Sequence, residues 1–342
     1  METVRLGRTG LQVTRTAFGA LPIQRIAAAE AARLLRRAFD AGINFFDTAR
    51  MYSDSEEKIG LALADVRPRI VIATKSHASD RKGVLDHLAV SLRNLKTDYV
   101  DLLQLHNPAS PPDPDDPESA YAGAVEARRQ GMTRFIGITN HRLTVARAAV
   151  ESGLYDTLQF PLSSISSDED LRLPELCRDR DVGLIAMKAL SGGLITHAAA
   201  AFAFLRQFGN VVPIWGIQRE AELDEFLRLE AHPPALDDAM RDAIQRDRRD
   251  LAGDFCRGCG YCLPCPQEIP IPMAARMALL LRRSPCEPLL TEAWREQMHR
   301  IEQCTECRQC SDRCPYGLDT PNLLKRMLAD YDQFSAAHRR DA

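Results

Sequence analysis

The sequence predicts an α/β protein with two parts: a (β/α)₈ TIM barrel that begins with a β-hairpin, and a small α-helical domain rich in cysteine. One observation is that short apolar runs alternate with helical patterns over residues 1–230. The other is that every cysteine except Cys177 lies between Cys256 and Cys314. Because 342 residues suffice for about two domains, we expect the barrel at 1–230, a linker at 231–253 and the cysteine-rich domain at 254–342.

The elements of the barrel follow in order along the chain. Two short alternating runs flank Arg8-Thr9-Gly10 and predict the hairpin. The expected strands are 16–20, 43–46, 70–73, 99–105, 135–138, 157–160, 182–187 and 211–215. The expected helices are 28–40, 54–64, 83–95, 118–130, 141–151, 170–180, 198–208 and 219–229. Apolar strands separated by helices form parallel sheets, and this number of units matches a barrel.

A doubly wound sheet is the alternative to the barrel. Such a sheet usually has a Gly-x-Gly-x-x-Gly turn after its first strand, whereas here the turn reads Gly19-Ala20-Leu21-Pro22. The barrel is therefore favoured. Residues 108–117 contain five prolines and three aspartates, which predicts a solvated loop after the fourth strand.

Composition excludes several classes of protein. Lys plus Arg is 44 and Asp plus Glu is 47, so no basic excess indicates nucleic acid or an anionic membrane as a partner. No apolar run approaches the ~18 residues of a membrane helix. The first residues lack the layout of a secretion signal. We therefore expect a cytoplasmic protein whose cysteines bind metal rather than form disulfides.

Polar residues at the ends of consecutive strands predict an active site. Asp47, Lys75 and His106 end the second, third and fourth strands, and Tyr52 lies in the loop after Asp47. In a barrel all four lie on the C-terminal face, where active sites are built. Taken singly, each has a structural alternative: a packing tyrosine, an ion pair at the barrel mouth, or a half-buried histidine.

The four groups together fit the reduction of a carbonyl. A tyrosine has a pKa of about 10, and we expect the Lys75 ammonium to lower the pKa of Tyr52. Asp47 would hold Lys75 charged. His106 would orient a carbonyl and donate to its oxygen, so that an alkoxide can be protonated.

The cysteines form two motifs near the C-terminal end. Cys256-x₂-Cys259-x₂-Cys262-x₂-Cys265-Pro266 precedes Cys304-x₂-Cys307-x₂-Cys310-x₃-Cys314-Pro315. The second has the spacing of bacterial ferredoxins, in which the fourth cysteine binds the other cluster, and the first is one residue shorter. This predicts one [4Fe–4S] cluster on Cys256, Cys259, Cys262 and Cys314. It predicts the other on Cys304, Cys307, Cys310 and Cys265.

Two tetrathiolate zinc sites are the alternative for these cysteines, but paired zinc ribbons more often have two cysteines, a long gap and two more. Cys177 and Cys286 fall outside both motifs and are interpreted as small hydrophobic residues. Between the motifs we expect helices at 273–283 and 291–303.

Several of these motifs resemble the aldo-keto reductase family. They are Asn44-Phe45-Phe46-Asp47-Thr48-Ala49, Tyr52, Ala73-Thr74-Lys75 and Leu103-Gln104-Leu105-His106. The resemblance covers about 1–230 and implies a nicotinamide-dependent reductase of small aldehydes or ketones, or a dehydrogenase of the alcohols. It implies that Tyr52 is the proton donor, that Asp47 and Lys75 tune it, and that His106 orients the substrate.

The resemblance also implies positions for NADPH or NADH. These are Asn140, Gln159, Met187, Lys188, Gly216, Gln218, Arg219 and Glu225. Asn140 and Gln159 would hold the carboxamide, Met187 would pack on the nicotinamide and Lys188 would meet phosphate. The family's arginine for the 2′-phosphate is replaced by Glu222, so the choice between NADPH and NADH stays open.

The cysteine-rich region resembles the ferredoxin-like extension of one branch of these reductases. Hydride transfer moves two electrons, whereas a [4Fe–4S] cluster passes one. Three interpretations follow. In the first, the clusters hold the extension in place or sense redox state beside a hydride-transferring barrel. In the second, they relay electrons, with a redox partner protein, to a barrel that holds a flavin or runs radical chemistry. In the third, the protein is an electron-transfer module on an inactive barrel. The first is favoured because every residue it needs is present.

Overall fold

The computed structural model describes residues 1–253 and 255–341. The chain divides into two compact units. One consists of Met1–Ala189 and Ala199–Arg241, and the other of Leu190–Ala198 and Asp242–Ala342. Residues 254 and 342, the expected ends of the cysteine-rich domain, lie outside the described residues.

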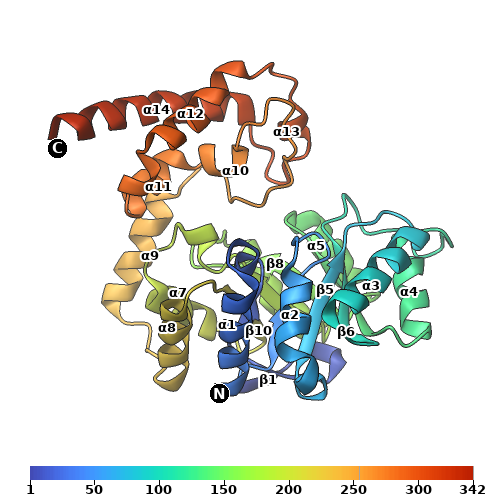
Figure 1. Ribbon diagram of the computed structural model, residues 1–342. Coiled ribbons are helices and arrows are strands. Elements are labelled where there is room, and N and C mark those ends of the chain that lie inside the picture. The colour runs from blue at the N-terminus through green and yellow to red at the C-terminus, as the bar shows by residue number, and fades with distance from the viewer. Residues whose placement is uncertain (254, 342) are drawn as a thin grey trace. The chain divides into compact units, whose positions relative to one another are not determined.

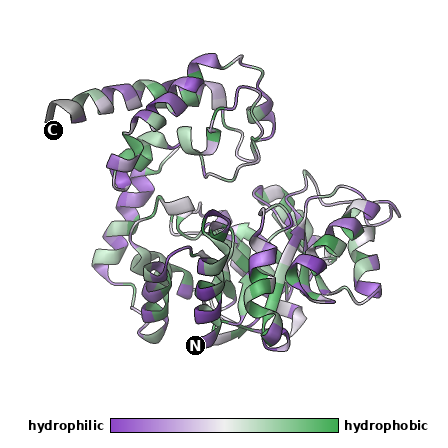
Figure 2. Cartoon of the chain, viewed as in Figure 1, coloured by the Kyte–Doolittle hydropathy of each residue, from purple (hydrophilic) through white to green (hydrophobic). Residues whose placement is uncertain are grey.

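The first unit is a closed barrel of parallel strands in the order β10-β3-β4-β5-β6-β7-β8-β9, which confirms the expected fold (Figure 1). Its strands are β3 (Ala17–Gly19), β4 (Phe45–Asp47), β5 (Val71–Ser76), β6 (Val100–His106), β7 (Thr133–Thr139), β8 (Thr157–Pro161), β9 (Gly183–Met187) and β10 (Val211–Gly216). The strands are mostly apolar, as Figure 2 shows, because both of their faces are covered.

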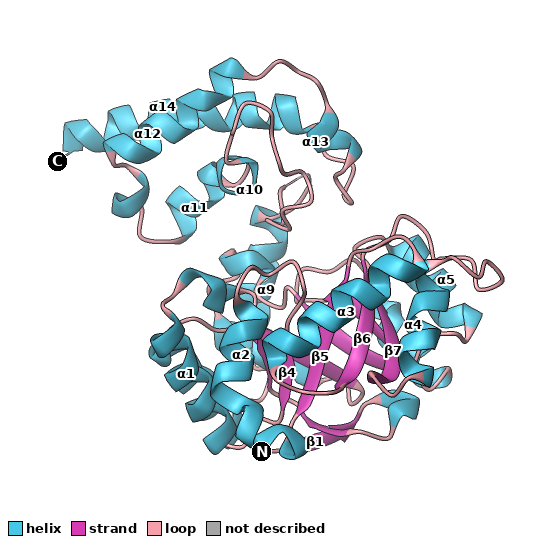
Figure 3. Cartoon of the chain, turned by 45° about the vertical axis from the view of Figure 1, so that its right-hand side comes forward, coloured by secondary structure: helices cyan, strands magenta, loops and turns pink. Residues whose placement is uncertain are grey.

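Helices surround the strands of this unit (Figure 3). They are α1 (Ala28–Asp40), α2 (Ser55–Leu63), α3 (Arg81–Leu95), α4 (Ala120–Arg129), α5 (Leu143–Ser152), α6 (Leu173–Asp179), α7 (Ala198–Arg206) and α8 (Glu220–Ala231). Helix α1 shows why: Ala31, Leu34, Leu35, Ala38 and Phe39 are buried at helical spacing, so one stripe of the helix faces the barrel.

The expected hairpin is formed by β1 (Thr3–Arg5) and β2 (Gln12–Thr14), which pair antiparallel. Its apolar residues Leu6, Leu11 and Val13 belong to the same buried cluster as residues inside the barrel, including Phe45. The hairpin therefore closes the end of the barrel opposite the carboxyl ends of the strands.

The second unit is helical. Its helices are α9 (Asp238–Asp250), α10 (Ile271–Ala274), α11 (Met277–Arg283), α12 (Glu292–His299), α13 (Gln309–Asp312) and α14 (Thr320–Asp341). Helices α11 and α12 correspond to the two helices expected between the cysteine motifs. The expected linker at 231–253 contains α9, which is hydrophilic along most of its length (Figure 2).

Helix α14 was not predicted, although the sequence holds a signal for it. Leu323, Leu324 and Tyr331 are buried in the core of the second unit, with Met327 and Leu328 packed against the same core. This spacing is that of an apolar helical stripe. Within the described residues, no helix is both long and apolar enough to cross a lipid bilayer.

We expect Gly7→Ala to lower the free energy of unfolding more than Gly10→Ala. Both glycines have positive φ, so either alanine costs about 1–2 kcal/mol from backbone conformation. A Cβ at Gly7 would lie 2.2 Å from the backbone nitrogen of Gly183, whereas one at Gly10 meets nothing within 4 Å. This collision adds about 1–3 kcal/mol. Urea unfolding of both variants measures the difference, and equal losses would contradict the role of the hairpin in closing the barrel.

Candidate active site and cysteine cavities

The barrel brings the four predicted polar residues together at the carboxyl ends of its strands. Asp47 ends β4, Lys75 lies near the end of β5 and His106 ends β6. The Lys75 Nζ donates to Asp47 Oδ2 at 2.6 Å and to the Thr48 carbonyl oxygen at 2.6 Å. It also lies 5.1 Å from the centre of the Tyr52 ring. The Tyr52 and His106 rings meet edge to face, with 6.0 Å between their centres.

Burial dominates the electrostatics of the ion pair. Asp47 and Lys75 are 2% and 1% exposed. Burial raises the pKa of Asp47 and lowers the pKa of Lys75, while the attraction between the two charges opposes both changes. A contact of 2.6 Å with hydrogen bonds on both partners is the arrangement that keeps a buried pair charged.

The pKa of Tyr52 differs from the sequence expectation. Burial, followed by the nearby Asp47 carboxylate, raises this pKa above its usual value instead of lowering it. The physical reason is that burial disfavours the charged phenolate, and the neighbouring negative charge of Asp47 disfavours it further. Tyr52 therefore keeps its proton at neutral pH, which is the state that a proton donor requires.

His106 is neutral in this environment. Its pKa is lowered well below the usual value by burial, and then by the charges of Lys75, His141 and His77. A neutral imidazole still carries one N–H group that can donate to a carbonyl oxygen. Both groups that would face a substrate oxygen are therefore uncharged hydrogen-bond donors near neutral pH.

Sequence reasoning missed two buried residues of this site. Gln104 Nε2 donates to Asp47 Oδ1 at 3.3 Å and to Gln159 Oε1 at 2.9 Å, so it joins the ion pair to β8. A polar residue inside the apolar run of β6 was a signal for it. Glu56, on α2, accepts hydrogen bonds from Thr74 and Arg50. Nothing in the local pattern distinguishes Glu56 from a solvated helix residue.

The expected coenzyme residues follow the ends of β7 to β10 and extend into α8. Asn140 and Gln159 are buried. Asn140 donates to the Pro108 carbonyl oxygen and accepts from the Arg142 backbone N–H, while Gln159 accepts from Gln104. Both side-chain amides are thus hydrogen-bonded to other parts of the protein in this structure.

The remaining expected positions are half-buried or exposed. Met187 ends β9 and Lys188 follows it with a left-handed backbone, at φ 58°. Gly216 ends β10, and Gln218 and Arg219 lead into α8, which also contains Glu225.

The start of α8 already carries a carboxylate. Glu222 Oε2 accepts hydrogen bonds from the backbone N–H groups of Gln218, at 2.9 Å, and Arg219, at 3.2 Å. These donors at the first turn of a helix are the groups that would otherwise attract an anion. In this structure the side chain of Glu222 therefore takes the place of such an anion.

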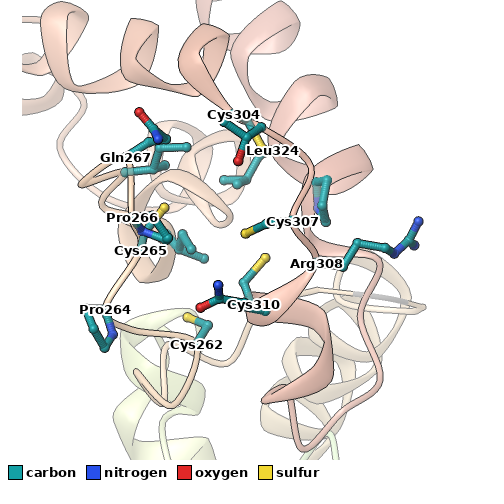
Figure 4. A pocket seen from close by; sticks show the side chains of 15 residues that line it. Cys262, Pro264, Cys265, Pro266, Gln267, Cys304, Cys307, Arg308, Cys310 and Leu324 are labelled. Carbon is teal, nitrogen blue, oxygen red and sulfur yellow. The ribbon is translucent and has the colours of Figure 1, made fainter.

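The cysteines of the two motifs line two cavities in the second unit. One cavity is lined by cysteines from both motifs: Cys256, Cys259, Cys262 and Cys314. The other is lined by Cys262, Cys265, Cys304, Cys307 and Cys310, which project into the same space from two segments (Figure 4). Cys262 and Ile271 line both.

The donor chemistry of these cavities fits iron–sulfur clusters. Among the described residues, neither lining includes histidine, aspartate or glutamate, and the other side chains are largely apolar. Sets of thiolates in such surroundings are the ligands of [4Fe–4S] clusters. Cys177 is fully buried and Cys286 packs at the edge of the core, both outside these linings.

Comparison with known proteins follows the same division. The family described as "Aldo/keto reductase family" matches residues 15–201, and the family described as "4Fe-4S dicluster domain" matches 255–319. L-galactose dehydrogenase of Arabidopsis thaliana is 30% identical over 216 residues, which are 58% of this chain and 68% of that protein. Methylglyoxal reductase DkgB of Salmonella typhi is 35% identical over 121 residues, 34% of this chain and 45% of that protein.

Solved structures agree on the fold. The holo form of an aldo-keto reductase from Bacillus halodurans superposes with a TM-score of 0.63 and 20% identity, covering 72% of this chain and 96% of that one. The closed barrel and the family match together define a barrel oxidoreductase. The chain belongs to the aldo/keto reductase family, and it carries a 4Fe-4S dicluster domain at its C-terminal end.

Proposed function

We propose that the barrel reduces a small aldehyde or ketone by hydride transfer from a nicotinamide coenzyme, with Tyr52 as the proton donor. The observation that carries this proposal is the buried Lys75–Asp47 pair beside the Tyr52 ring. Methylglyoxal and L-galactose, named for two relatives, are both small carbonyl compounds, which supports this substrate class.

The residues at the carboxyl ends of the strands have different roles toward the substrate oxygen. His106 donates a hydrogen bond that orients the carbonyl, and Tyr52 delivers its proton as negative charge develops on that oxygen. Nicotinamide, when bound, supplies the hydride. As Tyr52 loses its proton, the Lys75 ammonium near its ring stabilises the phenolate that forms. Asp47 and the Thr48 carbonyl oxygen hold Lys75 in place, and Gln104 holds Asp47.

The coenzyme positions form the second part of the proposal. Asn140 and Gln159 would exchange their present partners for the carboxamide, Met187 would pack on the ring, and Lys188 would meet phosphate. Gly216, Gln218, Arg219 and Glu225 would contact the adenosine half. Because the Glu222 carboxylate occupies the start of α8, we propose NADH rather than NADPH as the preferred coenzyme.

The third part concerns the clusters. We propose that Cys256, Cys259, Cys262 and Cys314 bind one [4Fe–4S] cluster, and that Cys265, Cys304, Cys307 and Cys310 bind the other. Hydride transfer in the barrel needs no one-electron carrier. We therefore propose that the clusters organise the second unit. The alternative is a relay of single electrons, which is favoured by the adjacency of two cavities that share Cys262.

Tyr52→Phe tests the proton donor. We expect kcat for carbonyl reduction to fall about 10²- to 10⁴-fold, with the Kd for NADH unchanged. For the wild type we expect kcat to be independent of pH between about 6.5 and about 10, because the pKa of Tyr52 is raised and that of His106 is lowered. Steady-state kinetics measures both. Tyr121→Phe is the control, because it removes a hydroxyl that donates a hydrogen bond to the Leu154 carbonyl oxygen. Full activity of Tyr52→Phe would refute the proposal.

Glu222→Ala tests the coenzyme preference. Removing this carboxylate frees two backbone N–H groups and eliminates a negative charge at the start of α8. We therefore expect kcat/KM for NADPH to rise about tenfold relative to NADH. The lost cap should also lower the free energy of unfolding by about 1 kcal/mol. Glu220→Ala is the control, because Glu220 is an acidic residue in the same first turn of α8 and pairs with Arg37 instead. An unchanged ratio in Glu222→Ala would exclude Glu222 as the determinant.

Cys304→Ala tests the clusters. Anaerobically purified wild type should contain about eight iron and eight sulfide per chain, and the variant about half; Cys286→Ala should keep the full content. A colourless preparation loaded with zinc would contradict the cluster proposal. We expect Cys304→Ala to retain kcat for carbonyl reduction. Loss of turnover with unchanged NADH affinity would instead support the relay.

A further inference from the structure

A buried carboxylate that the proposed mechanism does not use lies close to the loop of Tyr52. Glu56 is fully buried and belongs to the first turn of α2, shortly after Tyr52 in the chain. A carboxylate at such depth carries a desolvation cost of several kcal/mol, which only well-placed partners can offset. The groups that offset it therefore show which parts of the barrel Glu56 holds together.

A loop, a strand and a helix of the barrel unit donate hydrogen bonds to this carboxylate. The Thr74 hydroxyl, on β5, donates to Glu56 Oε1 at 2.6 Å. Arg50 Nη1, in the loop between β4 and α2, donates to Oε2 at 3.0 Å and forms an ion pair with it. Asn94 Nδ2, on α3, donates to Oε2 at 3.4 Å. Glu56 therefore joins the loop after β4 to β5.

This loop and this strand carry two of the groups that the proposed mechanism needs. Tyr52 lies in the loop, and Lys75 follows Thr74 on β5. The Arg50 backbone N–H donates to the Lys75 carbonyl oxygen at 3.1 Å. The same arginine thus contacts β5 through its backbone and Glu56 through its side chain. A shift of Arg50 would change the distance between the Lys75 Nζ and the centre of the Tyr52 ring, which is 5.1 Å.

Glu56 also acts on the charge of Lys75. Burial lowers the pKa of Lys75, the Asp47 carboxylate opposes this change, and Glu56 adds a second negative charge that raises the same pKa. The ring of Tyr52 faces the ammonium from the loop, and His106 is affected by its charge from β6. A second carboxylate therefore favours the ammonium in surroundings that otherwise disfavour it.

The position of Glu56 distinguishes it from a carboxylate buried for stability alone. Asp101, 1% exposed, lies at the start of β6 and pairs with Arg67 and Arg134. In barrels of this kind the amino ends of the strands are associated with stability and the carboxyl ends with catalysis. Glu56 contacts β5 at Thr74, near the carboxyl end of that strand. Its contacts are therefore on the side of the candidate active site.

We propose that Glu56 is a positioning residue for proton transfer, because it fixes the separation of the Tyr52 phenol and the Lys75 ammonium. It acts through Arg50 and Thr74 rather than on the substrate. This rests on the proposed function, in which Tyr52 is the proton donor. A donor and a stabilising charge that are held in place before the substrate arrives lose no further conformational freedom in the reaction.

Glu56→Gln tests the proposal, because it removes the charge that pairs with Arg50 and keeps the size of the side chain. With benzaldehyde and NADH, we expect kcat to fall about ten- to a hundredfold, while the Kd for NADH by fluorescence titration is unchanged. Glu57→Gln is the control, since Glu57 is an exposed carboxylate in the same first turn of α2. It should keep the kcat of the wild type.

The pH profile separates positioning from a loss of folded protein. Because Glu56 favours the charged form of Lys75, the fall of kcat at alkaline pH should begin at a lower pH in Glu56→Gln than in the wild type. A smaller fraction of folded enzyme would instead lower kcat by the same factor at every pH. Hydrogen exchange of 48–54 should also be faster in Glu56→Gln than in Glu57→Gln.

The double variant Arg50→Met, Glu56→Gln provides a second test if Glu56→Gln folds poorly, because it leaves no unpaired charge in the interior. It should lower kcat about as much as Glu56→Gln, since the two residues act through one contact. The kcat and pH profile of the wild type, together with unchanged exchange of 48–54 in the variant that folds, would overturn the proposal. Full activity of Tyr52→Phe would instead refute the proposed function, and the exchange data would still report whether Glu56 orders the loop.

Discussion

The contact between the Lys75 ammonium and the Asp47 carboxylate is the interaction on which the active site depends. Placing two charges where almost no water reaches them carries a desolvation cost of several kcal/mol per ion. This cost is offset because Thr48 and Gln104 provide further hydrogen bonds to the same two side chains. The pair also joins β4 to β5, and Gln104 extends the connection to β6 and β8. The polar groups of the candidate active site therefore also link the strands of the barrel to one another.

The buried pair also explains why the site works with neutral donors. In the proposed mechanism, Lys75, whose charge is paired with Asp47, would leave the proton on Tyr52 before the reaction, and it lies close enough to stabilise the phenolate after transfer. His106, kept uncharged by burial and by neighbouring cations, adds a donor without adding charge. Under the proposed function, Tyr52 would keep its proton until negative charge develops on the substrate oxygen, as general acid catalysis at neutral pH requires.

Much of the fold was predictable from sequence because its signals are local. The eight apolar runs, the stripe of α1 and the turn at Gly10 each lie within a short window, and all correspond to observed elements. The cysteine spacing was equally informative, and it indicated the domain that comparison with known families identifies. Asp47, Lys75 and His106 could be placed at one end of the barrel because each ends a strand.

The remaining features depend on contacts between distant parts of the chain. The pKa of Tyr52 could not be predicted because it depends on the surroundings of the ring in the folded barrel, where burial and the Asp47 carboxylate both raise it. Glu222 was recognised as unusual for coenzyme binding, but its capping of α8 is a matter of side-chain geometry. The assignment of Leu190–Ala198 to the second unit has no local signal, since Arg276, which donates to the Gly192 carbonyl oxygen, is separated from Gly192 by 84 residues.

The path of the chain between the two units has an evolutionary consequence. The backbone passes from one unit to the other after Ala189, after Ala198 and after Arg241. A cysteine-rich extension appended to a finished barrel would need only the last of these crossings. Here the loop Leu190–Ala198, which follows β9 of the barrel, belongs to the cysteine-containing unit. Recombination at a single junction therefore cannot exchange either part for a homologous module. An exchange of either part would have to preserve all three crossings.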